Sequence, residues 1–149
     1  MVAGYCYDWN VKNNRGDWDI VIGTFKAKWN LKDDSIWAIN PNSFEEVGCI
    51  HTAQGLEFDY VGVIIGKDLT YNNETGKVET HQSAISKDDK SSGIRTLKNA
   101  QEARRLILNT YKTLLNRGQK GCYVYCEDDA LRKYFKKQIC PRSAQRNRP

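Results

Sequence analysis

The feature that most constrains the fold is a continuous apolar run, VGVIIG at residues 61–66, inside the longer segment FDYVGVIIG at residues 58–66. An uninterrupted β-branched run of this kind is typical of a strand in a parallel sheet that is covered on both faces. Residues 97–115 carry apolar side chains at spacings of three and four, which predicts an amphipathic helix. Residues 121–126 (GCYVYC) follow as another apolar strand. Strands that alternate with helices predict an α/β fold with a mainly parallel central sheet.

Weaker patterns complete the expected organisation. We expect further strands at residues 2–9, 19–23, 25–31 and 47–50, and a small hairpin whose strands are residues 69–71 and 77–80. The Ser-, Lys- and Asp-rich residues 81–93 are expected to form a mobile surface loop. Gly118 is expected to stop the long helix, and Asp128 or Asp129 to cap a last helix that runs to about Lys137. A strand that begins at residue 2 without a preceding element predicts a piece of a longer protein.

Composition excludes several classes of protein. The 149 residues correspond to one ordinary domain, and the longest uncharged apolar stretch is far too short to cross a membrane. The five cysteines include no CxxC pair, which favours free thiols in a reducing cytoplasm over disulfides or a metal site. We therefore expect a cytoplasmic protein with no metal ligands and no membrane contact.

The positive charge is concentrated at the end of the chain. The net charge is +5, yet seven basic and no acidic residues follow Leu131, whereas the rest of the chain holds 16 basic and 18 acidic residues. Such a segment is suited to nucleic acid or an acidic partner, and equally to a solvated tail. Residues 141–149 are expected to form a basic, disordered tail after a domain at residues 1–140.

Two segments carry residues suited to chemistry. The first, HTAQGLEFD at residues 51–59, lies between two apolar strands and contains Gly55, whose backbone reaches conformations closed to other residues. Thr52 can donate to a phosphate, and Glu57 can accept hydrogen bonds from sugar hydroxyls. This pattern fits a loop that contacts a nucleotide or a nucleic-acid backbone, and it fits a plain turn between strands equally well.

The second segment, NRGQKG at residues 116–121, joins the long helix to the next strand. Arg117 stands at the helix end, where its guanidinium is suited to a phosphate, although basic residues at that position often contribute only a helix-dipole interaction. The sequence contains no GxxxxGK[ST] phosphate-binding loop and no paired carboxylates of the kind that hold magnesium in ATPases. A complete ATPase is therefore not encoded in this chain.

Taken in order, the two segments resemble motifs V and VI of superfamily-one helicases. HTAQGLEFD, followed by the apolar residues 61–65, is similar to the motif V pattern T-x-H-x-[SA]-[KQ]-G-x-E-[FW]-D. Residues 106–125 (LILNTYKTLLNRGQKGCYVY) resemble motif VI, L-x-V-x-x-[ST]-R-A-x-x-x-L-x-[IV], with Asn116 and Gly118 in place of the usual neighbours of the arginine. The match is closest to bacterial P-loop proteins with a helicase core that are related to the Schlafen-type ATPases.

The resemblance implies a fold, partners and residue roles. It implies the second, C-terminal RecA-like domain of such an enzyme, a three-layer fold of the P-loop NTPase type without its own P-loop, completed by an upstream P-loop domain. ATP and Mg²⁺ would bind only in the full-length protein, and single-stranded DNA or RNA would be the partner. Arg117 would be the catalytic arginine finger, Gly55 and Glu57 would join it in binding ATP, and His51, Thr52 and Gln54 would face the nucleic acid.

A second hypothesis also fits the sequence. The chain would then be a catalytically inactive RecA-like module that binds nucleic acid or a protein, with the basic residues after Leu131 as its electrostatic contact. Arg117 distinguishes the two hypotheses, because the ATPase requires it and the binding module does not.

Overall fold

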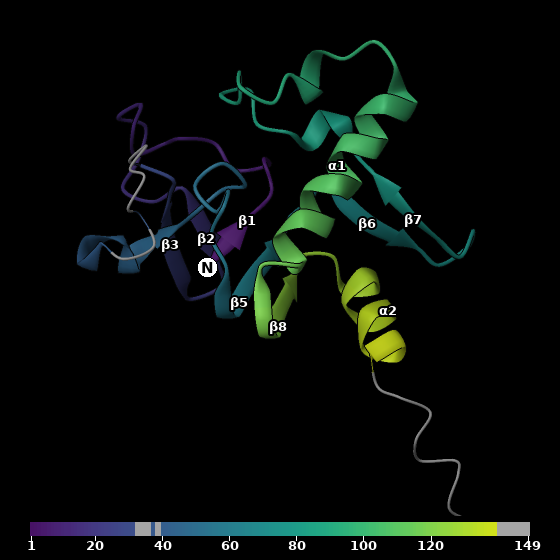
Figure 1. Cartoon of the computed structure of the whole chain (residues 1–149). Coiled ribbons are helices and arrows are strands. Elements are labelled where there is room, and N and C mark those ends of the chain that lie inside the picture. Colours follow the sequence, from purple (N-terminus) through teal and green to yellow (C-terminus); the bar gives the residue numbers. More distant parts are fainter. Residues whose placement is uncertain (32–36, 38–39, 140–149) are drawn as a thin grey trace, which may run out of the picture.

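The computed structural model describes residues 1–31, 37 and 40–139, and the elements follow the alternating pattern that the sequence predicts (Figure 1). They are, in chain order, β1 (Val2–Ala3), β2 (Ile20–Ile22), β3 (Phe25–Trp29), η2 (Pro41–Glu45), β4 (Glu46–Val47), β5 (Phe58–Ile65), β6 (Leu69–Asn72), β7 (Lys77–Thr80), η3 (Gln82–Ala84), η4 (Ile94–Thr96), α1 (Ala100–Leu115), β8 (Gly118–Cys126) and α2 (Asp129–Ile139).

The central sheet is parallel and is built around the apolar run. Strand β5 lies between β1 and β8 and is parallel to both, so that Val63 pairs with Val2 on one side and with Val124 on the other. A parallel bridge from Val2 to Gly48 continues this arrangement beyond β1. The predicted parallel strand is therefore confirmed at the centre of an α/β fold.

One face of this sheet is covered by α1, which crosses in front of β5 and β8 in Figure 1. Its buried side chains Ile107, Tyr111 and Leu114 pack with Val63 and Ile65 of β5 in the main core. The helix begins at Ala100 because the Asn99 side chain accepts hydrogen bonds from the backbone N–H groups of residues 101 and 102. Capping by an asparagine satisfies donors that the first helical turn leaves free, and this fixes the start of the helix.

A second, small sheet continues the central sheet beyond β1, and residues of both sheets form a second core on the face opposite α1. Strands β2 and β3 are antiparallel, and β4 runs parallel to β3. Trp29, which is fully buried, packs with Ile20 and Val47 of this sheet and with Ala3 and Ile64 of the central sheet. The described residues therefore form an α/β fold with a three-stranded parallel sheet and two helices, and the three-layer RecA-like arrangement stays a prediction.

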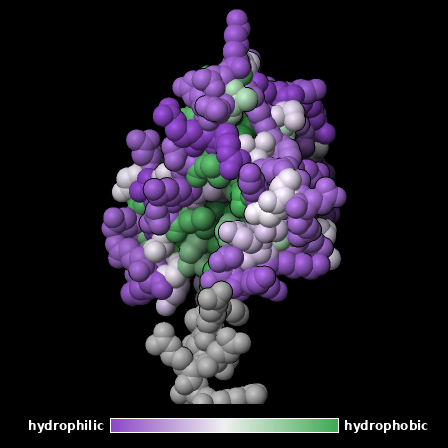
Figure 2. All heavy atoms as spheres, turned by 90° about the vertical axis from the view of Figure 1, so that its right-hand side faces the viewer, coloured by the Kyte–Doolittle hydropathy of each residue, from purple (hydrophilic) through white to green (hydrophobic). Residues whose placement is uncertain are grey.

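The predicted hairpin and last helix are also present. Strands β6 and β7 pair antiparallel, and α2 packs against β6 and β8. The face seen from the right of Figure 1 carries mostly hydrophilic residues, with hydrophobic residues visible in its central hollow (Figure 2). Residues 141–149, for which we expected a basic tail, lie outside the described residues.

Several predicted boundaries were wrong for identifiable reasons. The strand expected at residues 2–9 ends at Ala3, because the next backbone groups bond to residues 86–88 instead of a neighbouring strand: Tyr5 O accepts from Ser86 N at 2.8 Å, and Trp9 N donates to Asp88 at 3.1 Å. The strand expected at residues 47–50 ends at Val47, because a hydrogen-bonded turn starts at Cys49. Gly118 belongs to β8, and α1 has already ended at Leu115.

Residues 81–93, expected to be a mobile loop, are anchored at both ends. The Gln82 side-chain amide donates to the carbonyl oxygens of Ile94 at 2.7 Å and Leu97 at 2.8 Å. Asp89 is buried and accepts hydrogen bonds from the backbone N–H groups of Ser91 and Ser92. This anchored segment lies beside the N-terminal loop, because Ser86 bonds to Tyr5 and Asp88 bonds to Trp9.

Cysteines, acidic residues and histidines are dispersed in the described part of the chain. There, no group of three or more His, Cys, Asp or Glu side chains is placed to hold a metal ion, and Cys6, Cys49, Cys122 and Cys126 are free thiols. No helix in the same residues is long and apolar enough to cross a membrane.

Candidate functional site

The loop between β4 and β5 is compact and is organised by Thr52. Its hydroxyl accepts a hydrogen bond from Cys49 N at 2.8 Å and donates one to Cys49 O at 3.0 Å. Two backbone bonds, from Ala53 N to Cys49 O and from Gln54 N to His51 O, are each 3.1 Å long. Gly55 then turns the chain with a φ of +75°, a value that glycine adopts without strain. The loop buries Ala53 and leaves His51 and Gln54 exposed.

This geometry changes the expected role of Thr52. The sequence predicts a hydroxyl that faces nucleic acid, whereas in the structure the hydroxyl bonds to the backbone of its own loop. A Cβ on the neighbouring Gly48 would lie 2.7 Å from the Thr52 hydroxyl oxygen and 2.7 Å from the Trp37 ring. The close packing around Gly48 and the hydroxyl bonds together hold the backbone that carries His51 and Gln54 in one shape. The expected contact of Thr52 with nucleic acid stays a prediction.

Arg117 lies between the end of α1 and the start of β8. Its backbone N–H bonds to Leu114 O at 3.2 Å, and its carbonyl oxygen accepts from Phe58 N, the first residue of β5, at 2.9 Å. The side chain is half-buried, and its Nε atom is fully buried without a hydrogen-bond partner in the described residues. An unpartnered guanidinium N–H is costly to bury. Because Nε is buried, a ligand could contact Arg117 only through the rest of its half-buried side chain.

A groove brings Arg117 together with the loop. It has a volume of about 460 Å³ and runs beside α1 from Leu106 to Arg117. His51 and Gln54 line it opposite the helix, and Ser91 and Ser92 of the anchored segment also contribute. Two segments about sixty residues apart in the sequence therefore form one surface.

The other predicted site residues are not part of this groove. Glu57 is exposed at the start of β5, where it accepts a hydrogen bond from the side-chain amide of Gln119. Gly55 and Thr52 shape the loop but do not line the groove. The assignment of Gly55 and Glu57 to ATP binding stays a prediction.

Beneath the groove, α1 is fixed to the sheet by a buried polar contact. The Tyr111 hydroxyl donates to the Asp68 carboxylate and accepts from Gly66 N at 3.1 Å. Burial raises the pKa of Asp68 above its ordinary value, and the hydrogen bond from Tyr111 offsets this only in part. The contact ties α1, which ends two residues before Arg117, to the segment that follows β5.

A second pocket adjoins the groove, and most of its residues were missed by sequence reasoning. Its volume is about 510 Å³, and it shares Tyr5, His51 and Ser91 with the groove. Trp9 and Asn30 belong to loops around the small sheet, and Lys90 belongs to the anchored segment. No motif joins these positions, although a tryptophan available for stacking was a usable signal for Trp9.

Most of the chain is similar to known proteins. Residues 1–128 match the family model of the Schlafen group 3 DNA/RNA helicase domain. An uncharacterised protein of Saccharomyces cerevisiae is 29% identical over 135 residues, which cover 85% of this chain and 29% of the yeast protein. No solved structure matches the chain. Because the family model covers most of its length, the chain belongs to the Schlafen group 3 DNA/RNA helicase domain family.

Proposed function

We propose that this chain is the C-terminal half of a nucleic-acid-dependent ATPase with a helicase-like role. In this proposal, Arg117 is the arginine finger of an ATP site that an upstream P-loop domain completes, and the loop at residues 51–59 couples that site to nucleic acid. The observation that carries the proposal is the groove that joins Arg117 to His51 and Gln54. Membership of the helicase-domain family supports the same assignment.

The surroundings of Arg117 are suited to an arginine finger. Its backbone is fixed on both sides by hydrogen bonds to α1 and β5, and its half-buried side chain lines the groove. A fixed guanidinium donates a forked pair of hydrogen bonds to phosphate oxygens and stabilises the negative charge that develops during phosphoryl transfer. ATP and Mg²⁺ would supply the reacting phosphate and its counter-charge, with the phosphates held by the upstream domain.

Two further features agree with a larger protein. The chain spans 29% of the length of the yeast relative. On the sheet face opposite α1, Tyr60 and Tyr123 are 59% and 72% exposed, with ring centroids 6.3 Å apart. Parallel sheets are normally covered on both faces, so this exposed aromatic surface is suited to packing against the upstream domain.

The test is ATP turnover by the full-length protein with and without single-stranded DNA or RNA. Replacing Arg117 with alanine should reduce stimulated turnover about 10³-fold or more, because arginine fingers contribute 10³ to 10⁵ in rate. Binding of ATP should persist. The matched control is Arg105→Ala, since Arg105 is an exposed arginine of α1 that does not line the groove.

The outcome also decides between the two hypotheses. Turnover that is absent, or that is unchanged by Arg117→Ala, would contradict the proposed ATPase. Binding of nucleic acid without turnover would then favour the inactive binding module.

A further inference from the structure

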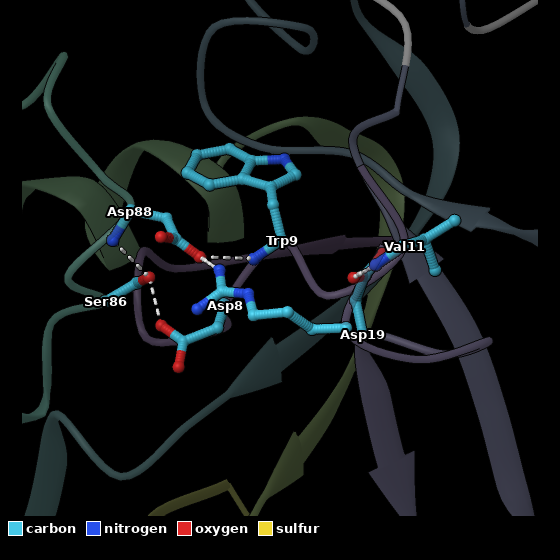
Figure 3. Close-up of polar contacts among 7 residues, drawn as sticks. Asp8, Trp9, Val11, Asp19, Ser86 and Asp88 are labelled. Atoms are coloured by element: carbon cyan, nitrogen blue, oxygen red, sulfur yellow. Dashed lines mark hydrogen bonds and ion pairs between the residues drawn. The ribbon is translucent and has the colours of Figure 1, made fainter. Parts of the chain in front are cut away.

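The pocket beside the groove has an aromatic wall on an ordered loop. Trp9 lines it, and its ring centroid lies 6.2 Å from that of the buried Trp29. The indole N–H of Trp9 donates to Asn30 O at 3.4 Å. Figure 3 shows the Trp9 ring pointing away from the carboxylate of Asp8, out of the polar network that surrounds its backbone.

That polar network fixes the loop before any ligand binds (Figure 3). Asp88 accepts hydrogen bonds from the backbone N–H of Trp9 and from the Arg15 guanidinium. Two residues further on, Val11 N donates to Asp19 at 2.9 Å. Asp19 also accepts from Trp29 N at 2.7 Å, which ties the loop to β3. The aromatic wall is therefore preorganised, which reduces the entropy lost on binding.

The pocket also contains a buried acceptor without a partner. Asn30 is 8% exposed, and its side-chain Oδ1 has no hydrogen-bond partner in the described residues. Its backbone is held by the bond from Asn30 N to Val47 O, 3.0 Å long, in a left-handed conformation with φ of +41°. The atom is fully buried, so a ligand N–H group would reach it only after the amide turns toward the pocket, and that bond would remove the cost of the missing partner.

The charge at the pocket mouth is suited to a phosphate. Lys12 and Lys90 are exposed, line the pocket, and form no ion pair in the described part of the chain. The only acidic side chain among its lining residues is Asp88, which is already paired with Arg15. The mouth therefore offers two ammonium groups to an anion.

We propose that this pocket binds one nucleotide unit of a single-stranded nucleic acid, with the base against Trp9, a base N–H on Asn30, and the flanking phosphates on Lys12 and Lys90. Every base has a π-face and at least one N–H donor, so such a site takes any sequence. His51 lines both this pocket and the groove, which gives the bound strand a direct connection to Arg117. The inference rests on the proposed function and extends it to a specific base-binding site.

The test is equilibrium binding of fluorescein-labelled 15-mers to the full-length protein without ATP. The probes are oligothymidine, oligouridine and an abasic 15-mer with the same number of phosphates. Trp9→Ala should weaken binding of the two base-containing strands about tenfold, because one stacked base contributes an effect of that order. It should leave binding of the abasic strand unchanged, and Trp9→Phe should restore most of the affinity.

Matched variants separate stacking from folding and charge. Trp18→Ala removes a half-buried tryptophan that lies outside the pocket. It should change neither the affinity for the base-containing strands nor that for the abasic strand. Lys12→Gln and Lys90→Gln should each reduce the slope of log K against log salt by about 0.7, while Lys77→Gln, an exposed lysine of β7, should not.

Three outcomes would overturn the inference. Trp9→Ala could leave all affinities unchanged, it could weaken the abasic strand as much as the others, or free thymidine monophosphate could bind as tightly as the 15-mer. The first two would remove the base contact, and the third would indicate a pocket for a free nucleotide. If turnover still collapses in Arg117→Ala, the proposed function stands while this inference fails.

Discussion

At the scale of single residues, the environment of a carboxylate determines how it contributes to stability. Asp68 is 2% exposed beneath α1 and lies beside the Cys6 thiol and Tyr111, whose hydroxyl donates to it. Burial disfavours its charged form, and the nearby charge of Glu127 acts in the same direction, so its pKa is raised. By contrast, Asp59 is exposed and pairs with Lys120 at 2.7 Å, a contact of little energetic weight.

The raised pKa of Asp68 predicts a pH dependence of stability. Because the folded state holds this proton more tightly than the unfolded state, stability from this group is greatest below pH 3.8 and falls as the pH rises through the folded pKa. The asparagine of Asp68→Asn cannot ionise. The free energy of unfolding of this variant minus that of wild type should therefore rise between pH 3.8 and the pKa of Asp68 in the folded state. Between the pKa values of Asp68 in the unfolded and folded states, this difference should rise by about 1.4 kcal/mol per pH unit.

Urea unfolding at a series of pH values measures this difference. Asp59→Asn is the control, since it removes an exposed carboxylate and should give a nearly constant difference. A difference for Asp68→Asn that falls with increasing pH would contradict the prediction.

At the scale of elements, one side chain joins a helix to a hairpin. The Asp128 carboxylate accepts from Leu131 N at 2.7 Å, which caps α2, and from Tyr71 N in β6 at 3.1 Å. The stacked rings of Tyr71 and Tyr134, with centroids 4.4 Å apart, continue the same contact. Helix α2 is therefore held at its start by a carboxylate that also accepts a hydrogen bond from the hairpin.

Asp128→Ala should destabilise the protein by about 1–2 kcal/mol, since loss of a cap alone costs about 1 kcal/mol and the Tyr71 N–H also loses its partner. Asp128→Asn keeps an acceptor oxygen and should cost much less. Urea unfolding gives the energies, and hydrogen exchange at the Leu131 amide reports the helix start. Equal destabilisation by the two variants would show that the charge of Asp128, and not its hydrogen bonds, is the important property.

At the scale of the whole molecule, the proposed ATPase needs more than this chain. Arg117 lines the groove, yet the sequence has no GxxxxGK[ST] loop to hold β- and γ-phosphates. The proposed ATPase therefore requires a second domain, and closure of the two domains would bring Arg117 to the transferring phosphate.

The isolated 149-residue chain should accordingly show no ATP turnover, with or without single-stranded nucleic acid, while the full-length protein turns over ATP. A phosphate-release assay on both proteins measures this directly. Turnover by the isolated chain that follows the protein through successive purification steps would contradict the need for an upstream domain.

The sequence by itself determined the elements whose pattern is local and strong. The β-branched run of β5, the apolar face of α1 and the hairpin of β6 and β7 all depend on the periodicity of neighbouring residues. The resemblance to helicase motifs V and VI pointed to His51, Gln54 and Arg117, which the structure brings to one groove. The order of strands within the sheet was not accessible in this way, because it depends on pairing between distant residues.

Only the tertiary structure determined which partners the polar and aromatic side chains contact. Thr52 has the residue type of a phosphate donor, yet its hydroxyl bonds to the backbone N–H and carbonyl of Cys49, which the turn of the chain brings within hydrogen-bond distance. Trp9 and Asn30 share a pocket although 21 residues separate them, since Asp88 and Asp19 fold the intervening loop back onto β3. Local periodicity predicts elements, whereas long-range hydrogen bonds and burial select the partner of each polar group, and these exist only once the chain has folded.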